Sequence, residues 1–183
     1  MQEREIEVKA YLKNFEEIRK KLELLGCSLS EPVKQEDIIY LPNGVDIDDV
    51  KKGTNSLRIR KEKGKYIFNL KQRMDVSLDC IERETVIADP QAMNEIIKLL
   101  GFYEFQKLTK TRRKCKYNEY EICLDEVEGL GAFVEVEKIS SEDGEKVQQE
   151  LFQFLESLGV KCEERATRGY DILLHQKYTA YGI

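Results

Sequence analysis

Apolar and polar positions alternate with a period of two along seven stretches of the chain, a pattern typical of β-strands. In the first stretch the charged residues Glu5, Glu7 and Lys9 fall on one face, and the apolar residues between them fall on the other. The seven stretches are residues 5–9, 57–60, 65–71, 80–87, 109–117, 120–125 and 132–138. Each is predicted to form a strand with one apolar face and one charged face.

Four segments instead show the apolar spacing of amphipathic helices, and three of them have clear start and stop signals. Their expected N-caps are Asn14, Asp89 and either Ser141 or Asp143, and the glycines that end them are Gly26, Gly101 and Gly159. A shorter helix is expected at residues 170–177, and the polar segment 42–54 is expected to be a surface loop. Helices and mainly antiparallel strands in one chain predict the α+β class.

The spacing of these signals indicates an internal duplication. Glu5 and Glu7 recur 77 residues later as Glu82 and Glu84, and the first helix start and stop recur 75 residues later. Arg58 and Arg60 are followed, at the same 77-residue interval, by a second pair of charged residues, Glu135 and Glu137. We therefore predict two β-α-β-β-β halves, followed by the third and fourth helices.

Composition limits the classes of protein that fit. The 183 residues are enough for one domain, expected to span 1–183. The 30 basic and 35 acidic residues give a net charge of -5, which argues against a general nucleic-acid binder or a protein that binds anionic membranes. No stretch approaches the roughly 18 apolar residues of a membrane span, and no signal peptide is recognisable at the start. We expect a cytoplasmic protein.

The five cysteines are scattered without metal-binding spacing, and His175 is the one histidine. This pattern argues against a zinc or iron–sulfur site and favours free thiols. Any metal is expected to be a hard cation held by carboxylates. His175 itself is interpreted as a surface or helix-end residue, and Tyr170 as a packing residue.

The charged strand faces carry like charges in pairs, as in Glu5-x-Glu7, Arg58-x-Arg60 and Glu135-x-Glu137. A solvated face is the ordinary explanation for any one of these pairs, but like charges at close range are unfavourable. The pairs are explained together if the charged face is rolled inward around a ligand. Cations require an anion and paired carboxylates require a divalent metal, so a metal–triphosphate complex supplies both.

The ordered motifs resemble those of the CYTH superfamily, the triphosphate tunnel metalloenzymes. Glu5-x-Glu7-x-Lys9 resembles the ExExK signature, and the resemblance continues through 37–40, 57–60, Lys71, Glu84, 110–112, 125–137 and 169–174. Segments 36–60 and 122–137 look most like the class IV adenylyl cyclases, although the His-Phe pair that precedes ExExK in bacterial members is missing. The resemblance implies a closed or nearly closed antiparallel eight-stranded β-barrel tunnel with helices packed outside.

The resemblance also implies roles for single residues. The catalytic set would be Glu5, Glu7, Lys9 and Glu135, and the ligands of Mg²⁺ or Mn²⁺ would be Glu5, Glu7, Glu135 and Glu137. The triphosphate would be held by Lys9, Arg58, Arg60, Lys71, Lys110 and Arg112. Glu84 and Asp125 would lie elsewhere on the tunnel wall.

Three functions remain open at this point. The resemblance favours an adenylyl cyclase that converts ATP to cyclic AMP and pyrophosphate. The same site would also suit an inorganic, thiamine or nucleoside triphosphatase, or a non-catalytic module that binds polyphosphate or nucleotide. The expected partner is therefore a nucleoside triphosphate or inorganic triphosphate, with neither nucleic acid nor membrane, and a homodimer is left open.

Overall fold

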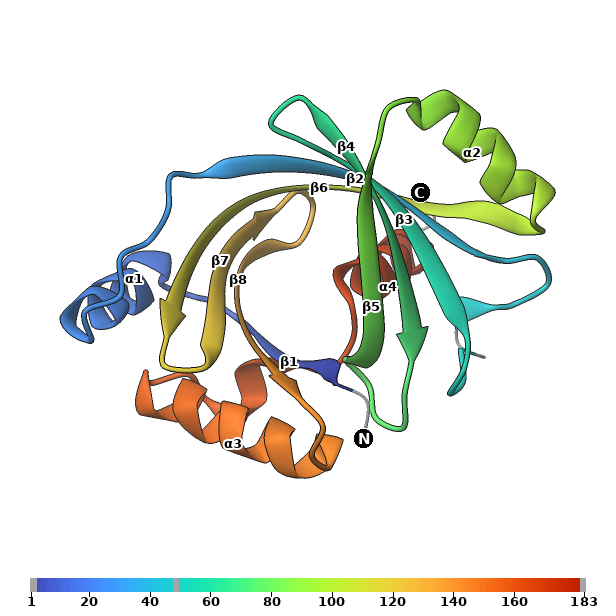
Figure 1. The fold of residues 1–183 in the computed structure, drawn as a ribbon. Coiled ribbons are helices and arrows are strands. Elements are labelled where there is room, and N and C mark those ends of the chain that lie inside the picture. Colours follow the sequence, from blue (N-terminus) through green and yellow to red (C-terminus); the bar gives the residue numbers. More distant parts are fainter. Residues whose placement is uncertain (1–2, 48–49, 182–183) are drawn as a thin grey trace.

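The computed structural model describes residues 3–47 and 50–181, which form two similar halves followed by a C-terminal segment (Figure 1). The first half contains β1 (Arg4–Tyr11), α1 (Phe15–Leu24), β2 (Val33–Pro42), β3 (Asn55–Glu62) and β4 (Lys65–Arg73). The second contains β5 (Asp79–Ile87), α2 (Pro90–Leu99), β6 (Phe102–Tyr117), β7 (Tyr120–Val127) and β8 (Gly131–Ser140). The final segment contains α3 (Gly144–Ser157), β9 (Arg165–Ala166) and α4 (Tyr170–Tyr181). The predicted β-α-β-β-β duplication is confirmed.

The strands form one antiparallel sheet in the order β5-β4-β3-β2-β6-β7-β8-β1-β9, and β5 also pairs with β1. This last pairing closes eight strands into a barrel, as predicted. The closing seam is short, because only Glu5 and Ile6 of β1 have partners on β5, namely Cys80 and Asp79. Further along β1, the two-residue β9 takes the place of β5. Closure removes the free edges that an open sheet would expose.

The alternating strand pattern sorts side chains between the outside and the inside of the barrel. Outward-facing residues such as Ile6, Val8 and Val136 are buried beneath α1 and α3, in a core that includes Leu22 and Leu151. A second outer core lies beneath α2, around its buried Ile97 and a set of strand residues, Tyr40, Leu57 and Ile59. Because helices cover the apolar face, the charged face is left to line the interior.

Helix α4 packs differently from the other three. Its residues Tyr170 and Leu174 contact inward-facing apolar side chains of the barrel, among them Leu108 and Phe133. Ile172 packs on Leu41 and Ile47. One end of the barrel interior is therefore lined by an apolar layer that includes the start of α4, with Tyr170 in the packing role expected from the sequence.

The expected helix caps are present at the three sites that the sequence marks. The side chains of Asn14, Asp89 and Asp143 accept hydrogen bonds from backbone amides in the first turns of α1, α2 and α3. Asp143, rather than Ser141, begins α3. Gly26, Gly101 and Gly159 follow these helices with positive φ angles, which glycine adopts without strain.

Strand β2 is absent from the seven alternating stretches, and it differs from them in its pattern of burial. Its central residues Ile38, Ile39, Tyr40 and Leu41 are consecutively apolar. Tyr40 packs in the outer core, while Ile39 and Leu41 pack in the apolar layers inside the barrel. A strand with apolar neighbours on both faces has no alternation to detect.

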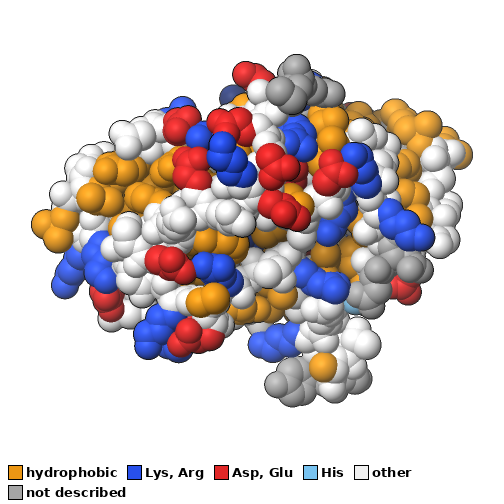
Figure 2. Space-filling model, turned by 90° about the horizontal axis from the view of Figure 1, so that it is seen from below, with side chains coloured by type: hydrophobic (Ala, Val, Ile, Leu, Met, Phe, Trp, Pro, Cys, Tyr) orange, Lys and Arg blue, Asp and Glu red, His pale blue; other side chains and the backbone are white. Residues whose placement is uncertain are grey.

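The loop expected at 42–54 is only partly a surface loop. Ile47 is buried, and residues 48–49 lie outside the described residues. Acidic and basic side chains are interspersed over the face of the molecule shown in Figure 2. No helix in the described part of the chain is long and apolar enough to cross a membrane.

Candidate active site

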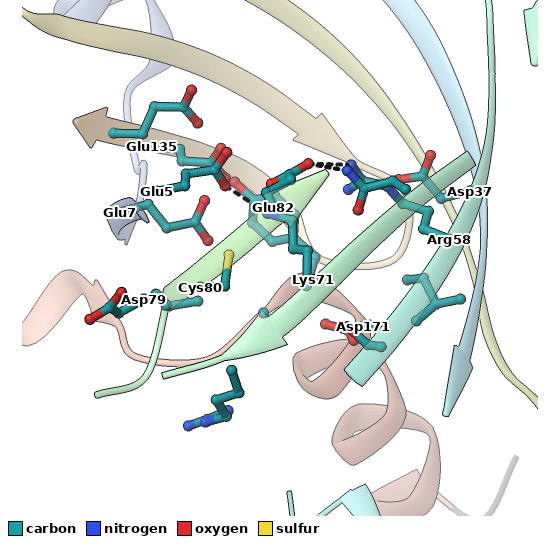
Figure 3. A pocket seen from close by; sticks show the side chains of 18 of the residues that line it. Glu5, Glu7, Asp37, Arg58, Lys71, Asp79, Cys80, Glu82, Glu135 and Asp171 are labelled. Carbon is teal, nitrogen blue, oxygen red and sulfur yellow. Dashed lines mark hydrogen bonds and ion pairs between the residues drawn. The ribbon is translucent and has the colours of Figure 1, made fainter. Parts of the chain in front are cut away.

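The barrel encloses a cavity of about 720 Å³, which is within the range of about 300–1,000 Å³ typical of small-molecule sites. Its lining comes mostly from the charged faces of the strands, together with the first residues of α4. Figure 3 shows carboxylates of β1, β5 and β8 on one side of this space and the Asp37–Arg58 pair on the other. All twelve site residues predicted from the sequence, except Asp125, appear in its lining.

Three carboxylates form a cluster on β1 and β8. Oxygens of Glu5, Glu7 and Glu137 lie within 4.8 Å of one another. Glu7 and Glu137 are direct cross-strand partners, so the register of the sheet itself brings two like charges together. Burial and the neighbouring carboxylates raise the pKa of Glu5 to about 7 and that of Glu137 to about 8. Two amines contact the cluster, Lys9 at Glu7 and Lys71 at Glu5, but each also pairs with a further glutamate, so the negative charge is not balanced.

Glu135 lies two residues from Glu137 on the same inner face, but it has different partners. It accepts hydrogen bonds from Lys9 Nζ at 2.7 Å and from Arg112 Nη2 at 2.9 Å. Burial opposes the charge of Glu135, but Arg112 and Lys9 outweigh it and hold its pKa well below the usual range. Glu135 therefore joins the cations of two strands, while Glu137 completes the carboxylate cluster.

Arginines on β3 and β6 each hold a buried aspartate. Arg60 donates two hydrogen bonds of 2.7 Å to Asp37, and Arg112 donates bonds of 2.7 and 2.5 Å to Asp125. These are bidentate pairs, the geometry in which arginine binds carboxylate or phosphate most strongly. Although burial opposes ionisation, the arginine hydrogen bonds lower the pKa of Asp37 to about 2.

Lys110 lies in the same region and has an excess of positive neighbours. It is 4% exposed, and its Nζ is 3.4 Å from Asp125, an acid already held by Arg112. Burial and the charge of Arg112 lower the pKa of Lys110 to about 8. The Nζ atoms of Lys9 and Lys110 each lie 5.0 Å from the centre of the Tyr170 ring. The electron-rich face of the ring stabilises both ammonium groups in these positions.

The cavity thus has two unlike sides. We call Glu5, Glu7, Glu82 and Glu137, on β1, β5 and β8, the carboxylate wall; Lys9 and Lys71 are the amines that contact it. We call Arg58, Arg60, Lys110 and Arg112, on β3 and β6, the cation wall; Asp37 and Asp125 are its acids. The first wall carries an excess of negative charge and the second an excess of positive charge.

Glu82 is a site residue that the sequence-based set omits. It accepts a hydrogen bond from Asn69, and it forms ion pairs with Lys71 at 2.8 Å and Arg58 at 3.5 Å. Glu84, which the resemblance placed on the tunnel wall, lines the cavity but is exposed. Glu82 shares the charged face of its strand with Glu84, so the alternation offered a signal for both residues. Asp37 was omitted too, although it lies in a motif of the resemblance.

His175 is half-buried on α4, and its ring centre lies 4.9 Å from that of Phe105. The five cysteines are free, and four of them are buried. Of these, Cys80 lines the cavity beside Glu5 and Glu82. The scattered spacing of the cysteines in the sequence gave no indication of this position.

A closed antiparallel barrel with a charged interior defines a tunnel protein. The family model of the CYTH domain matches residues 3–170, and the chain belongs to this family. It is 33% identical over 170 residues to a Methanocaldococcus jannaschii protein named "Putative adenylate cyclase", covering 91% of this chain and 95% of that protein.

Two solved structures share the fold. The PH1819 protein of Pyrococcus horikoshii is 31% identical, with a TM-score of 0.78 over 94% of this chain and 99% of that one. The HpAC1 protein of Hippeastrum, which is described as having a dominant triphosphatase activity, gives a TM-score of 0.62 over 96% of both chains. Since it is 20% identical, this second likeness shows the fold alone.

Proposed function

We propose that the chain is a divalent-metal-dependent enzyme that converts ATP to cyclic AMP and pyrophosphate. The observation that carries the proposal is that the two walls of one cavity have opposite excesses of charge. A metal–triphosphate complex would offset both, with its metal at the carboxylate wall and its phosphates at the cation wall. The name of the Methanocaldococcus jannaschii relative supports the choice of reaction.

Glu5, Glu7 and Glu137 fit a hard divalent cation, because they offer three carboxylates within reach of one ion and are short of positive charge. When bound, Mg²⁺ or Mn²⁺ supplies positive charge beside the phosphate oxygens and the attacking hydroxyl. The resemblance counts Glu135 as a metal ligand. We propose a different role, in which its hydrogen bonds hold the side chains of Lys9 and Arg112 inside the cavity.

The cation wall is proposed to bind the phosphates. Arg58, Arg60, Lys110 and Arg112 line the cavity together, and Lys9 and Lys71 extend the set toward the carboxylate wall. In an in-line attack of the ribose 3′-hydroxyl on the α-phosphorus, negative charge develops on the departing pyrophosphate. Fixed cations stabilise that charge without rearrangement, and they also orient the phosphate chain for the attack.

An apolar region next to the cation wall favours a nucleotide over a bare phosphate chain. Asp37, Ile39 and Leu41 follow one another along the inner face of β2, and Leu41 packs with Ile47 and Ile172. At about 3.3 Å per residue, Leu41 lies roughly 13 Å along the strand from Asp37. A nucleoside can bury its base in this region while its phosphates remain among the cations.

A triphosphatase is the second candidate, and the composition of the charged walls favours it. The charged groups described above are of the kinds that bind phosphate or metal, so they would also suit inorganic triphosphate or thiamine triphosphate. In that reaction water attacks the terminal phosphorus. Nothing in the chemistry of the two walls themselves requires a ribose.

Product analysis distinguishes the two reactions. The purified chain is incubated with Mn²⁺ and either ATP or inorganic triphosphate, with Glu137→Gln as the inactive control. We expect cyclic AMP and pyrophosphate from ATP, and a lower rate with inorganic triphosphate, because only ATP can use the apolar region. Orthophosphate from triphosphate without cyclic AMP from ATP would establish the triphosphatase instead.

A further inference from the structure

The short seam that closes the barrel places a cysteine beside two glutamates. Cys80 of β5 is the direct cross-strand partner of Glu5 of β1, and Glu82 lies two residues further along the same face of β5. The Cys80 sulfur and a carboxylate oxygen from each glutamate lie within 4.8 Å of one another. Figure 3 shows the sulfur directed toward the space that Glu5, Glu82 and Lys71 share.

The Cys80 thiol is buried in this cluster without a partner. Its residue is 9% exposed, it forms no disulfide, and no hydrogen bond involves it among the residues that the structure describes. The positive charge in the cluster comes from Lys71, whose Nζ lies 2.7 Å from Glu5 and 2.8 Å from Glu82. The ammonium group of Lys71 therefore contacts the same two carboxylates that a metal ion would use.

We propose that Glu5, Cys80 and Glu82 form a binding site for a thiophilic divalent cation such as Zn²⁺, distinct from the carboxylate cluster of Glu5, Glu7 and Glu137. A thiolate with two carboxylates suits Zn²⁺ or Co²⁺ better than Mg²⁺, which prefers oxygen ligands alone. The three protein ligands leave a fourth tetrahedral position for water or substrate. The site exists whichever triphosphate reaction the chain catalyses.

The geometry requires small movements of side chains. With ligand bonds of about 2.0–2.3 Å, the ligand atoms of a tetrahedral zinc lie roughly 3.5 Å apart, so the side chains must approach by about 1 Å. Lys71 must move away, and the thiol must release its proton to solvent as the metal–sulfur bond forms. Because Glu5 belongs to both clusters, a metal at Cys80 would also compete for Glu5 with the metal of the carboxylate cluster.

Co²⁺ in place of Zn²⁺ makes the site visible, because a thiolate bound to Co²⁺ gives a charge-transfer absorption band in the near ultraviolet. The full chain is titrated with Co²⁺ and then with Zn²⁺. We expect the band to appear with one equivalent of Co²⁺ and to disappear when Zn²⁺ displaces it. Cys80→Ser should abolish the band, while Cys162→Ser, which changes an exposed thiol, should leave it intact.

Further variants test the ligands separately from the thiol. Glu82→Gln should weaken Co²⁺ binding by roughly tenfold or more, since even outer-shell partners contribute that much. Glu84→Gln is the matched control on the same strand face and should have no effect. Lys71→Met should tighten binding, because it removes the competing ammonium but keeps all three ligands. Glu137→Gln should keep the band even if it abolishes activity. The band therefore tests the Cys80 site independently of the proposed reaction.

Several results would overturn the proposal. These are a band that persists in folded Cys80→Ser, the absence of any band in the parent chain, and unchanged affinity in Glu82→Gln. If Cys80→Ser does not fold, Glu82→Gln and Lys71→Met still decide the question, because both retain the thiol.

Discussion

The carboxylate wall and the cation wall differ in how their charges are satisfied. On the cation wall each acid is held by an arginine fork, as Asp37 is by Arg60, and its pKa falls. On the carboxylate wall, burial and the neighbouring acids raise the pKa of Glu5 to about 7 and that of Glu137 to about 8. The surplus on the cation wall is positive, and there burial and the charge of Arg112 lower the pKa of Lys110 to about 8.

The difference separates charged groups that are already paired without a ligand from groups whose charge is in surplus, and each wall contains some of the second kind. Asp37 and Arg60 satisfy each other, so this pair stabilises the barrel even when no ligand is bound. Glu137 has acids as its neighbours, so its charge is unfavourable until a cation binds. Substitutions on the two walls should therefore have different consequences for stability and for activity.

The largest expected effect is a loss of stability when a buried ion pair of the cation wall is broken. Arg60→Met leaves the buried Asp37 without its fork, and removing one partner of a buried pair typically costs about 3–5 kcal/mol. Urea unfolding would measure the loss. The double variant Asp37→Asn with Arg60→Met should recover most of the stability, because no charge is then left unpaired. If both variants are equally unstable, the pair does not act as a unit.

A substitution in the carboxylate wall should instead lower turnover without lowering stability. Glu137→Gln removes one of the proposed metal ligands, and we expect turnover to fall by roughly a hundredfold or more, equivalent to about 2.7 kcal/mol. Stability should not fall, since the substitution relieves repulsion among carboxylates. Glu135→Gln, two residues away, is the matched comparison and should lower stability because it weakens bonds to Lys9 and Arg112. Melting curves and turnover assays of both variants check this contrast.

Much of the fold follows from the alternation of side chains along the strands. Alternation identified seven of the eight barrel strands, and the caps identified three helices. It missed β2, because Ile38 and Tyr40 are apolar on one face and Ile39 and Leu41 on the other. It also missed β9, since two residues carry no periodicity.

The candidate site is harder to predict, because alternation gives the face of a residue but not its partner. Glu135 and Glu137 share a face, and the sequence offers no means of telling them apart. The strand register distinguishes these two glutamates, because it sets Lys9 opposite Glu135 and Glu7 opposite Glu137. In the same way, closure of the barrel brings Cys80 to Glu5 from 75 positions away in the chain.

A smaller effect is expected in the pH dependence of stability. Glu5 and Glu137 have raised pKa values in the folded protein, so the folded state binds more protons than the unfolded state between about pH 5 and 8. Stability without metal should therefore fall as pH rises through this window. Mg²⁺ should flatten the slope by favouring the ionised carboxylates, and Glu137→Gln should reduce it. A metal-free protein whose stability rises from pH 5 to 8 would contradict the assigned crowding.

The smallest effect is expected at the mouth of the cavity, where Glu84 tests how far the carboxylate wall extends. Glu84 shares a strand face with Glu82 but is exposed, so Glu84→Gln should change stability by no more than about 0.5 kcal/mol. Glu82→Gln should cost about 1–3 kcal/mol, because Arg58 and Lys71 each lose a charged partner. Urea unfolding of both variants gives the comparison. Equal losses would mean that the wall continues to the mouth, and that exposure does not separate these two glutamates.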